Sequence, residues 1–249
     1  MMRSEWRRKR WRELIYELLL GLCLIVLASF AFPRLTWLGS LGYALIALLL
    51  TQLVMIRKPV LTLQDRLYQA LGLVALSALL LWLLTPVRWE TSGVPLVLSW
   101  GVLVGWSVIR LMERLATERH VTSAMLMGAA AGYLLLGLTA GLVMSAVETI
   151  QPGSFEPLDI PITDAAGQNY TVIGSAAVFA QINYFAFICL TTVGFGDINP
   201  ELPLARILAV STGIAGPLYL AVVMGVLIGR YAGDREIEDR LEQHDPNRR

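Results

Sequence analysis

The sequence predicts an all-α membrane protein with six transmembrane helices, on the basis of three observations. The chain of 249 residues is 56% hydrophobic and only 16% charged, with a mean hydropathy of +0.62, which is too apolar for a soluble domain. Uncharged stretches long enough to cross a bilayer follow one another along the chain. On the resulting layout, 17 of the 20 Lys and Arg residues fall on one side of the membrane, as cytoplasmic loops require.

The connections between the apolar stretches support this division. Pro33, Pro59 and Pro86 lie in or beside them, where residues that end helices belong. The layout places both termini in the cytoplasm and makes the chain a multi-pass protein of a plasma or inner membrane. The expected spans are 14–32, 37–56, 67–85, 93–111, 121–147 and 203–231.

Residues 1–13 form a basic segment, with six Lys and Arg residues directly before the first span. A short basic run can bind nucleic acid or direct nuclear import, but before a membrane span it more often fixes the orientation of that span. We therefore predict a cytoplasmic N-terminus and no nucleic-acid partner. A cleaved signal peptide is disfavoured because the apolar stretch is too long and lacks a small-residue cleavage pattern.

Residues 14–111 are expected to form a four-helix peripheral membrane domain. No Lys or Arg lies deep in any of its spans, whereas a voltage sensor needs several arginines at three-residue spacing in one helix. The domain therefore lacks sensor charges. Residues 112–120 have apolar positions at helical spacing among charged ones, which suits a cytoplasmic interfacial linker helix and, equally, a solvated connector.

Residues 121–231 have a different organisation, because a long polar loop at 148–176 follows the apolar helix at 121–147. Two interpretations of this outer loop stay open. It could be an acidic vestibule that concentrates cations by electrostatic focusing, or a solvated turret whose charges only keep it in water. The loop has no Lys or Arg, and its acidic residues are Glu148, Glu156, Asp159 and Asp164.

Residues 191–197, called here the TTVGFGD segment, fit a potassium selectivity filter. Such a filter replaces the water shell of K⁺ with stacked rings of backbone carbonyl oxygens. Successive carbonyls point the same way only if the backbone alternates in handedness, and Gly194 and Gly196 reach left-handed conformations without a Cβ clash. Thr192 can add hydroxyl oxygens below the carbonyls. The predicted K⁺-binding residues are Thr192, Val193, Gly194, Phe195 and Gly196.

The TTVGFGD segment resembles the signature of tetrameric potassium channels, with Phe where Tyr is commoner. The resemblance covers about residues 179–231, and Pro200 and Arg206 stand where the outer mouth of these channels often has them. It implies a re-entrant pore helix at 177–191 and a filter at 192–197, between the fifth and sixth spans. Non-helical backbone at membrane depth is tolerated where it lines an enclosed cavity.

The resemblance also implies which residues support the filter. Phe195 lacks a tyrosine hydroxyl and Phe185 lacks the donor of the tryptophan common at its position, so support is expected to rest more on aromatic packing. Ile188 stands where some members have a carboxylate that pairs with the aspartate, so Asp197 needs another partner, for which Tyr184 is the candidate. The expected support residues are Thr191, Asp197, Tyr184, Phe185 and Ile188.

In the sixth span, Gly216 lies where these channels often carry a hinge glycine, and Pro217 removes a helical hydrogen bond beside it. Close packing of small residues between membrane helices is the alternative interpretation, and both can hold. The helix phase of the family implies that Leu220, Met224 and Ile228 line the cavity and form an apolar inner gate.

One filter segment cannot close a ring of carbonyls, and no second copy is visible, so four chains around a four-fold axis are expected. The resemblance thus implies a homotetrameric, K⁺-selective channel subunit in a lipid bilayer. The missing sensor arginines indicate weak or absent intrinsic voltage gating. A potassium uptake transporter subunit and a non-conducting regulatory membrane subunit are the alternatives. The cytoplasmic tail, residues 232–249, either continues the last helix or is disordered. It is too short for a ligand-binding domain, so a regulator would be another subunit or a ligand of the membrane domain.

No catalytic constellation accompanies these features. We find no nucleophile–base pair and no phosphate-binding glycine loop, and we predict no enzymatic activity. The permeant K⁺ is the only metal ion expected, with no organic cofactor, because the cysteines and histidines are too few and too far apart for a metal site. These residues are Cys23, Cys189, His120 and His244.

Overall fold

The structure of the chain is a computed structural model that is mostly helical. It describes residues 2–30, 32, 36–55, 66–68, 70–75, 77, 99–110, 123–158 and 176–244. The expected linker at 112–120 and loop residues 159–175 lie outside the described residues. So do most of the expected third span at 67–85 and the first part of the fourth span at 93–111.

The described residues include five helices and two short strands with complete bounds. They are α1 (Met2–Ser29), α2 (Thr36–Met55), α5 (Ser123–Ile150), β1 (Phe155–Glu156), α6 (Ala176–Leu190), β2 (Asn199–Pro200) and α7 (Pro203–His244). Residues 99–110 are also helical. The expected outer helix corresponds to α5, the expected pore helix to α6 and the expected inner helix to α7.

Two of these helices are long and apolar enough to cross a membrane by length and composition. They are α5 and the Pro203–Val226 part of α7. The apolar stretches of α1 and α2, Leu14–Ser29 and Leu41–Leu50, are shorter than a full span. The six-span layout therefore stays a prediction.

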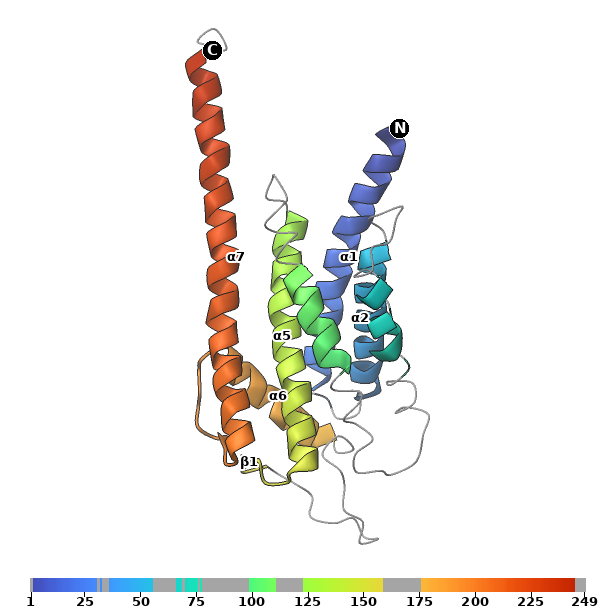
Figure 1. Cartoon of the computed structure of the whole chain (residues 1–249), viewed down its shortest axis with the longest axis vertical. Coiled ribbons are helices and arrows are strands. Elements are labelled where there is room, and N and C mark those ends of the chain that lie inside the picture. Colours follow the sequence, from blue (N-terminus) through green and yellow to red (C-terminus); the bar gives the residue numbers. More distant parts are fainter. Residues whose placement is uncertain are drawn as a thin grey trace.

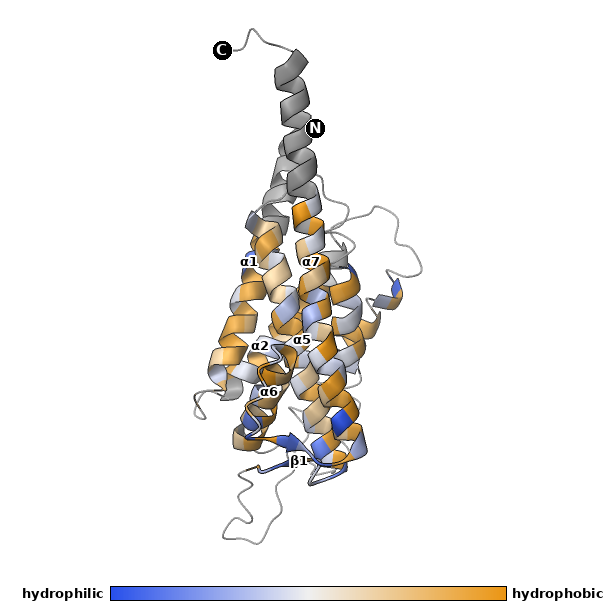
Figure 2. Ribbon diagram, turned by 90° about the vertical axis from the view of Figure 1, so that its left-hand side faces the viewer, coloured by the Kyte–Doolittle hydropathy of each residue, from blue (hydrophilic) through white to orange (hydrophobic). Residues whose placement is uncertain are grey.

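The helices lie roughly side by side, with α5 between α1 and α7 (Figure 1). The short helix α6 crosses near one end of the molecule and packs against both α5 and α7. The start of α1 and the end of α7 extend toward the opposite end (Figure 1). Hydrophilic residues gather around β1, while apolar residues dominate the helices above it (Figure 2). The end of the molecule at β1 is thus polar, and the helices above it are apolar (Figure 2).

Two apolar clusters hold the helices together. The first joins α1, α2 and residues 99–110 to α5, and includes the fully buried Trp100 and Leu135. Aromatic contacts extend it to α6, since the ring of Tyr43 lies 5.1 Å from that of Trp100 and 6.5 Å from that of Phe179. The second cluster packs α6 against the end of α5, β1 and the start of α7. The N-terminal helices therefore pack on the C-terminal helices of the same chain.

The contact between α5 and α6 depends on glycine. Gly137 and Gly141 are one helical turn apart on α5. A Cβ atom at Gly137 would collide with the ring of Phe187, and one at Gly141 with the side-chain amide of Asn183. Small residues at four-residue spacing let membrane helices approach closely. Here they let α6 lie directly on the backbone of α5.

Helix α7 continues well beyond the expected end of the inner helix at residue 231, as far as His244. Of the two possibilities for the tail, residues 232–244 therefore continue the last helix. Residues 235–244 are rich in strong helix formers. At its other end, α7 begins with Pro203, a residue favoured in the first turn.

Gly141→Ala is expected to lower the free energy of unfolding by about 1–3 kcal/mol, because the added methyl group has no space against Asn183. Denaturant titration of the purified protein in mild detergent would measure it. Gly105→Ala is the control, because a Cβ there meets nothing within 4 Å and alanine favours helix over glycine. Equal losses in both variants would contradict the close α5–α6 contact.

Candidate functional site

The TTVGFGD segment begins where α6 ends, and backbone hydrogen bonds define that junction. The N–H of Thr192 donates to the carbonyl of Cys189 (3.0 Å), and the N–H of Val193 donates to the carbonyl of Ile188 (3.0 Å). Thr192 has a φ of 59°. This pattern is a Schellman motif, in which the residue after the helix adopts the left-handed conformation that glycine usually supplies.

The other two carbonyls of the last turn of α6 also have donors. The carbonyl of Phe187 accepts from the N–H (2.9 Å) and the hydroxyl (2.8 Å) of Thr191. The carbonyl of Leu190 accepts from the hydroxyl of Tyr133 on α5 at 3.3 Å. The carbonyls of Phe187, Ile188, Cys189 and Leu190 are thus all satisfied, and the start of the segment is fixed in place.

Left-handed backbone recurs at every second residue of the segment. The φ angles are 59° at Thr192, 54° at Gly194 and 77° at Gly196. A Cβ at either glycine would meet nothing within 4 Å, so the backbone conformation and not lack of space calls for glycine there. At Thr192 the same conformation is strained, by about 1–3 kcal/mol for a residue with a branched side chain. Strain of this kind persists only where surrounding bonds hold it.

Hydrogen bonds also hold the outer end of the segment. The hydroxyl of Tyr184 on α6 donates to Oδ2 of Asp197 at 2.7 Å, which is the partner that the sequence suggested for this carboxylate. The other oxygen, Oδ1, accepts from the N–H of Ile198 at 3.1 Å, and the amide of Asn199 donates to the carbonyl of Gly196 at 3.4 Å. Tyr184 thus ties the outer end of the segment to α6.

The side chains of Phe185 and Ile188, two of the expected support residues, pack in the apolar cluster behind α6. The ring of Phe185 is buried and lies 5.4 Å from that of Phe155, outside the segment, and Ile188 belongs to the same apolar cluster. Within one chain, the side chains of Val193 and Phe195 are 52% and 70% exposed. Hydrogen bonds therefore hold the segment directly, while aromatic packing acts behind α6.

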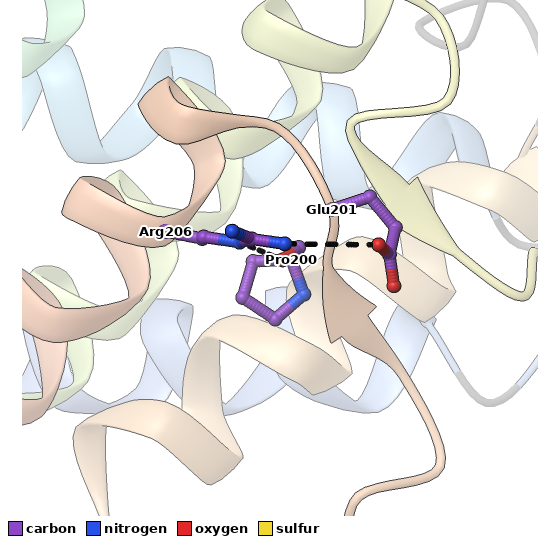
Figure 3. Close-up of polar contacts among 3 residues, drawn as sticks. All are labelled: Pro200, Glu201 and Arg206. Atoms are coloured by element: carbon purple, nitrogen blue, oxygen red, sulfur yellow. Dashed lines mark hydrogen bonds and ion pairs between the residues drawn. The ribbon is translucent and has the colours of Figure 1, made fainter.

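A two-stranded antiparallel sheet connects the loop before α6 to the chain after the segment. Phe155 in β1 pairs with Pro200 in β2, and the N–H of Glu201 donates to the carbonyl of Ser154 at 2.8 Å. Arg206 closes the corner between β2 and α7, because its Nε donates to the carbonyl of Pro200 at 3.1 Å (Figure 3). Its ion pair with Glu201, at 3.9 Å, is exposed and adds little.

The prediction that Glu148 belongs to the acidic outer loop is wrong. Glu148 lies in the last turn of α5 and is fully buried. Its carboxylate accepts hydrogen bonds from the N–H groups of Gly153 (2.7 Å) and Phe155 (2.9 Å). Buried charge is tolerated only when such donors surround it, so Glu148 serves to hold the turn that leads into β1.

The other acidic residues of the loop lie partly inside and partly outside the described residues. Glu156 is exposed, while Asp159 and Asp164 lie outside the described residues. Sequence reasoning missed the role of Glu148, although one signal was present. A lone carboxylate at the end of a long apolar helix, directly before a Pro-Gly-Ser turn, has nearby backbone donors to accept from.

The structure gives Gly216 of α7 a packing role. The residue is buried, and a Cβ there would collide with the carbonyl oxygen of Leu190 at the end of α6. Pro217 follows inside the continuous helix. The proposed gate residues Leu220, Met224 and Ile228 are all exposed in the single chain. Close packing is therefore observed at Gly216, and its hinge role stays a prediction.

One comparison with known proteins bears on this site. Residues 162–232 match a family model described as "Ion channel". The match covers α6, the TTVGFGD segment, β2 and α7 as far as residue 232. No curated protein and no solved structure matches the chain. The C-terminal part of the chain therefore contains an ion channel domain.

Glu148→Gln is expected to lower the free energy of unfolding by about 1–3 kcal/mol, because the amide offers one acceptor where the carboxylate offers two. Hydrogen exchange at the amides of Gly153 and Phe155 should accelerate. Both quantities can be measured on the purified protein. Glu156→Gln, at an exposed neighbouring position, is the matched control. Unchanged exchange at the two amides would refute the role given to Glu148.

Proposed function

We propose that the protein is a subunit of a potassium-selective channel, through which K⁺ permeates passively down its gradient. The observation that carries the proposal is the left-handed backbone at Thr192, Gly194 and Gly196, within an ion channel domain. Left-handed backbone at alternate residues turns successive carbonyl oxygens to one side of the chain. A stack of such oxygens can replace the hydration shell of K⁺.

One chain contributes only one segment, so four copies of the chain would be needed to close a ring of carbonyls. The side chains of the segment and of α7 agree with this proposal. Ile207, Val210 and Ile214, at three- and four-residue spacing on α7, are 63%, 62% and 55% exposed. These three residues and Phe195, which is also exposed, are apolar side chains that a second copy of this chain, or lipid, would cover.

The proposed site divides into permeation and support. Backbone carbonyls of residues 192–196 and the hydroxyl of Thr192 would coordinate K⁺. Thr191, Tyr184 and Asp197 hold the two ends of the segment through the hydrogen bonds described above. Leu220, Met224 and Ile228 would face the pore below the segment and gate it as an apolar constriction.

Wild-type protein in K⁺-loaded liposomes should release K⁺ when a protonophore is added, faster than Na⁺ from matched liposomes, and Ba²⁺ should block the release. Gly194→Ala should abolish the selective flux, because alanine at a φ of 54° costs about 1–2 kcal/mol in each subunit. A light-scattering or ion-electrode assay would record the flux.

Gly21→Ala is the control for that experiment, because Gly21 lies in α1 and a Cβ there meets nothing within 4 Å. It should conduct like the wild type. Equal K⁺ and Na⁺ flux through the wild type would overturn K⁺ selectivity. Full selective flux through Gly194→Ala would show that the segment is not the K⁺ pathway.

A further inference from the structure

Two tyrosines connect the three helices that meet below the TTVGFGD segment. Tyr133 on α5 donates its hydroxyl hydrogen bond to the carbonyl of Leu190, the last residue of α6. Tyr219 on α7 is buried and donates to the carbonyl of Ala129 on α5 at 2.7 Å. The two rings lie 5.9 Å apart at an interplanar angle of 46°. The chain of contacts thus runs from α7 to α5 and on to the end of α6.

The place of these contacts along α7 is informative. Gly216 lies directly against the carbonyl of Leu190, and Gly213 lies beside that of Cys189, so this stretch of α7 packs closely on the end of α6. Pro217 then removes one helical hydrogen bond, which is where helices bend most readily. Tyr219 lies two residues after Pro217, within one turn of it. A bend at Pro217 therefore changes the contact of Tyr219 with α5.

The hydroxyl of Tyr133 is the donor to the last carbonyl of α6, that of Leu190. The carbonyls of Phe187, Ile188 and Cys189 have donors from the segment itself. The carbonyl of Leu190 has its donor from another helix, α5. Its loss would leave a carbonyl without its side-chain donor in a residue that is only 1% exposed, next to the strained backbone of Thr192.

We propose that Tyr133 is a positioning residue which, through its contact with Tyr219, transmits the position of α7 below Pro217 to the lower end of the TTVGFGD segment. The role in permeation rests on the channel function proposed above. When Tyr219 is in the position described here, the ring of Tyr133 is held and Leu190 keeps its donor. When α7 bends and Tyr219 moves, the support of the segment weakens. The inner helix and the filter are then coupled within one subunit.

Hydrogen exchange of the segment tests this proposal without depending on ion flux. In Tyr133→Phe, the amides of Thr191, Thr192 and Val193 should exchange about threefold to tenfold faster, the factor expected for one lost hydrogen bond. Tyr219→Phe should accelerate hydrogen exchange at the same amides, although the hydrogen bond that it removes joins α7 to α5. In the double variant, exchange should accelerate by less than the product of the two single factors, because both substitutions interrupt the same set of contacts.

Tyr68→Phe is the matched control, because it removes another buried hydroxyl that donates to a backbone carbonyl, that of Leu50 at 3.1 Å. It should leave exchange in the segment unchanged. If Tyr133→Phe affects the segment no more than Tyr68→Phe, the positioning role is refuted. If Tyr219→Phe leaves the segment unchanged, the transmission from α7 is refuted.

Liposome flux with the same variants separates this proposal from the channel function. Tyr133→Phe should lower K⁺ flux about threefold to tenfold at low K⁺ concentration. The flux should return to the wild-type value at high K⁺ concentration, because bound ions stabilise the carbonyl rings. If the wild type passes no ions but the variants show the expected exchange pattern, the proposed channel function is overturned and the contact between the helices stands. A conducting wild type with unaltered exchange and flux in Tyr133→Phe would overturn the positioning role alone.

Discussion

The left-handed backbone at Thr192 is the constraint on which the rest of the structure depends. A residue with a branched side chain does not adopt a φ of 59° by its own preference. It is held there because α6 ends in a Schellman motif whose two bonds require a left-handed residue at that position. The alternation at Gly194 and Gly196 continues from this point. The direction of the whole segment is therefore set by how α6 terminates.

Since α6 carries this constraint, its own position must be fixed, and the chain fixes it on several sides. Gly137 and Gly141 allow α6 to pack closely on α5, and Gly216 allows α7 to pack on the last carbonyl of α6. Tyr184 fastens the outer end of the segment to α6 itself. Beyond that end, the buried Glu148 holds the turn before β1, and β1 pairs with β2. The supports are short-range and polar near the segment, and apolar behind it.

The sequence predicted these features to different degrees. The helices α5 and α7 and the alternation of glycines follow from hydropathy and from the stereochemistry of glycine, which are local properties, whereas α6 was implied by the resemblance. The pairing of Tyr184 with Asp197 was reached through the resemblance. Glu148 could not be placed, because its burial depends on a turn that brings Gly153 and Phe155 back over the helix end. The packing of Gly216 on Leu190 likewise depends on how two helices cross.

The distribution of glycine and tyrosine explains how this structure can be both close-packed and able to move. Gly216 brings the backbone of α7 against that of α6, and Gly141 lets the side-chain amide of Asn183 lie on the backbone of α5, so both contacts leave little room for movement. Below Pro217, α7 instead contacts α5 through the rings of Tyr133 and Tyr219 and the hydroxyl of Tyr219. A ring contact and a single hydrogen bond can separate and form again without opening the core. Motion of α7 is thus confined to the part of the helix beyond the glycine contacts, where it changes the support of the segment without dismantling α6.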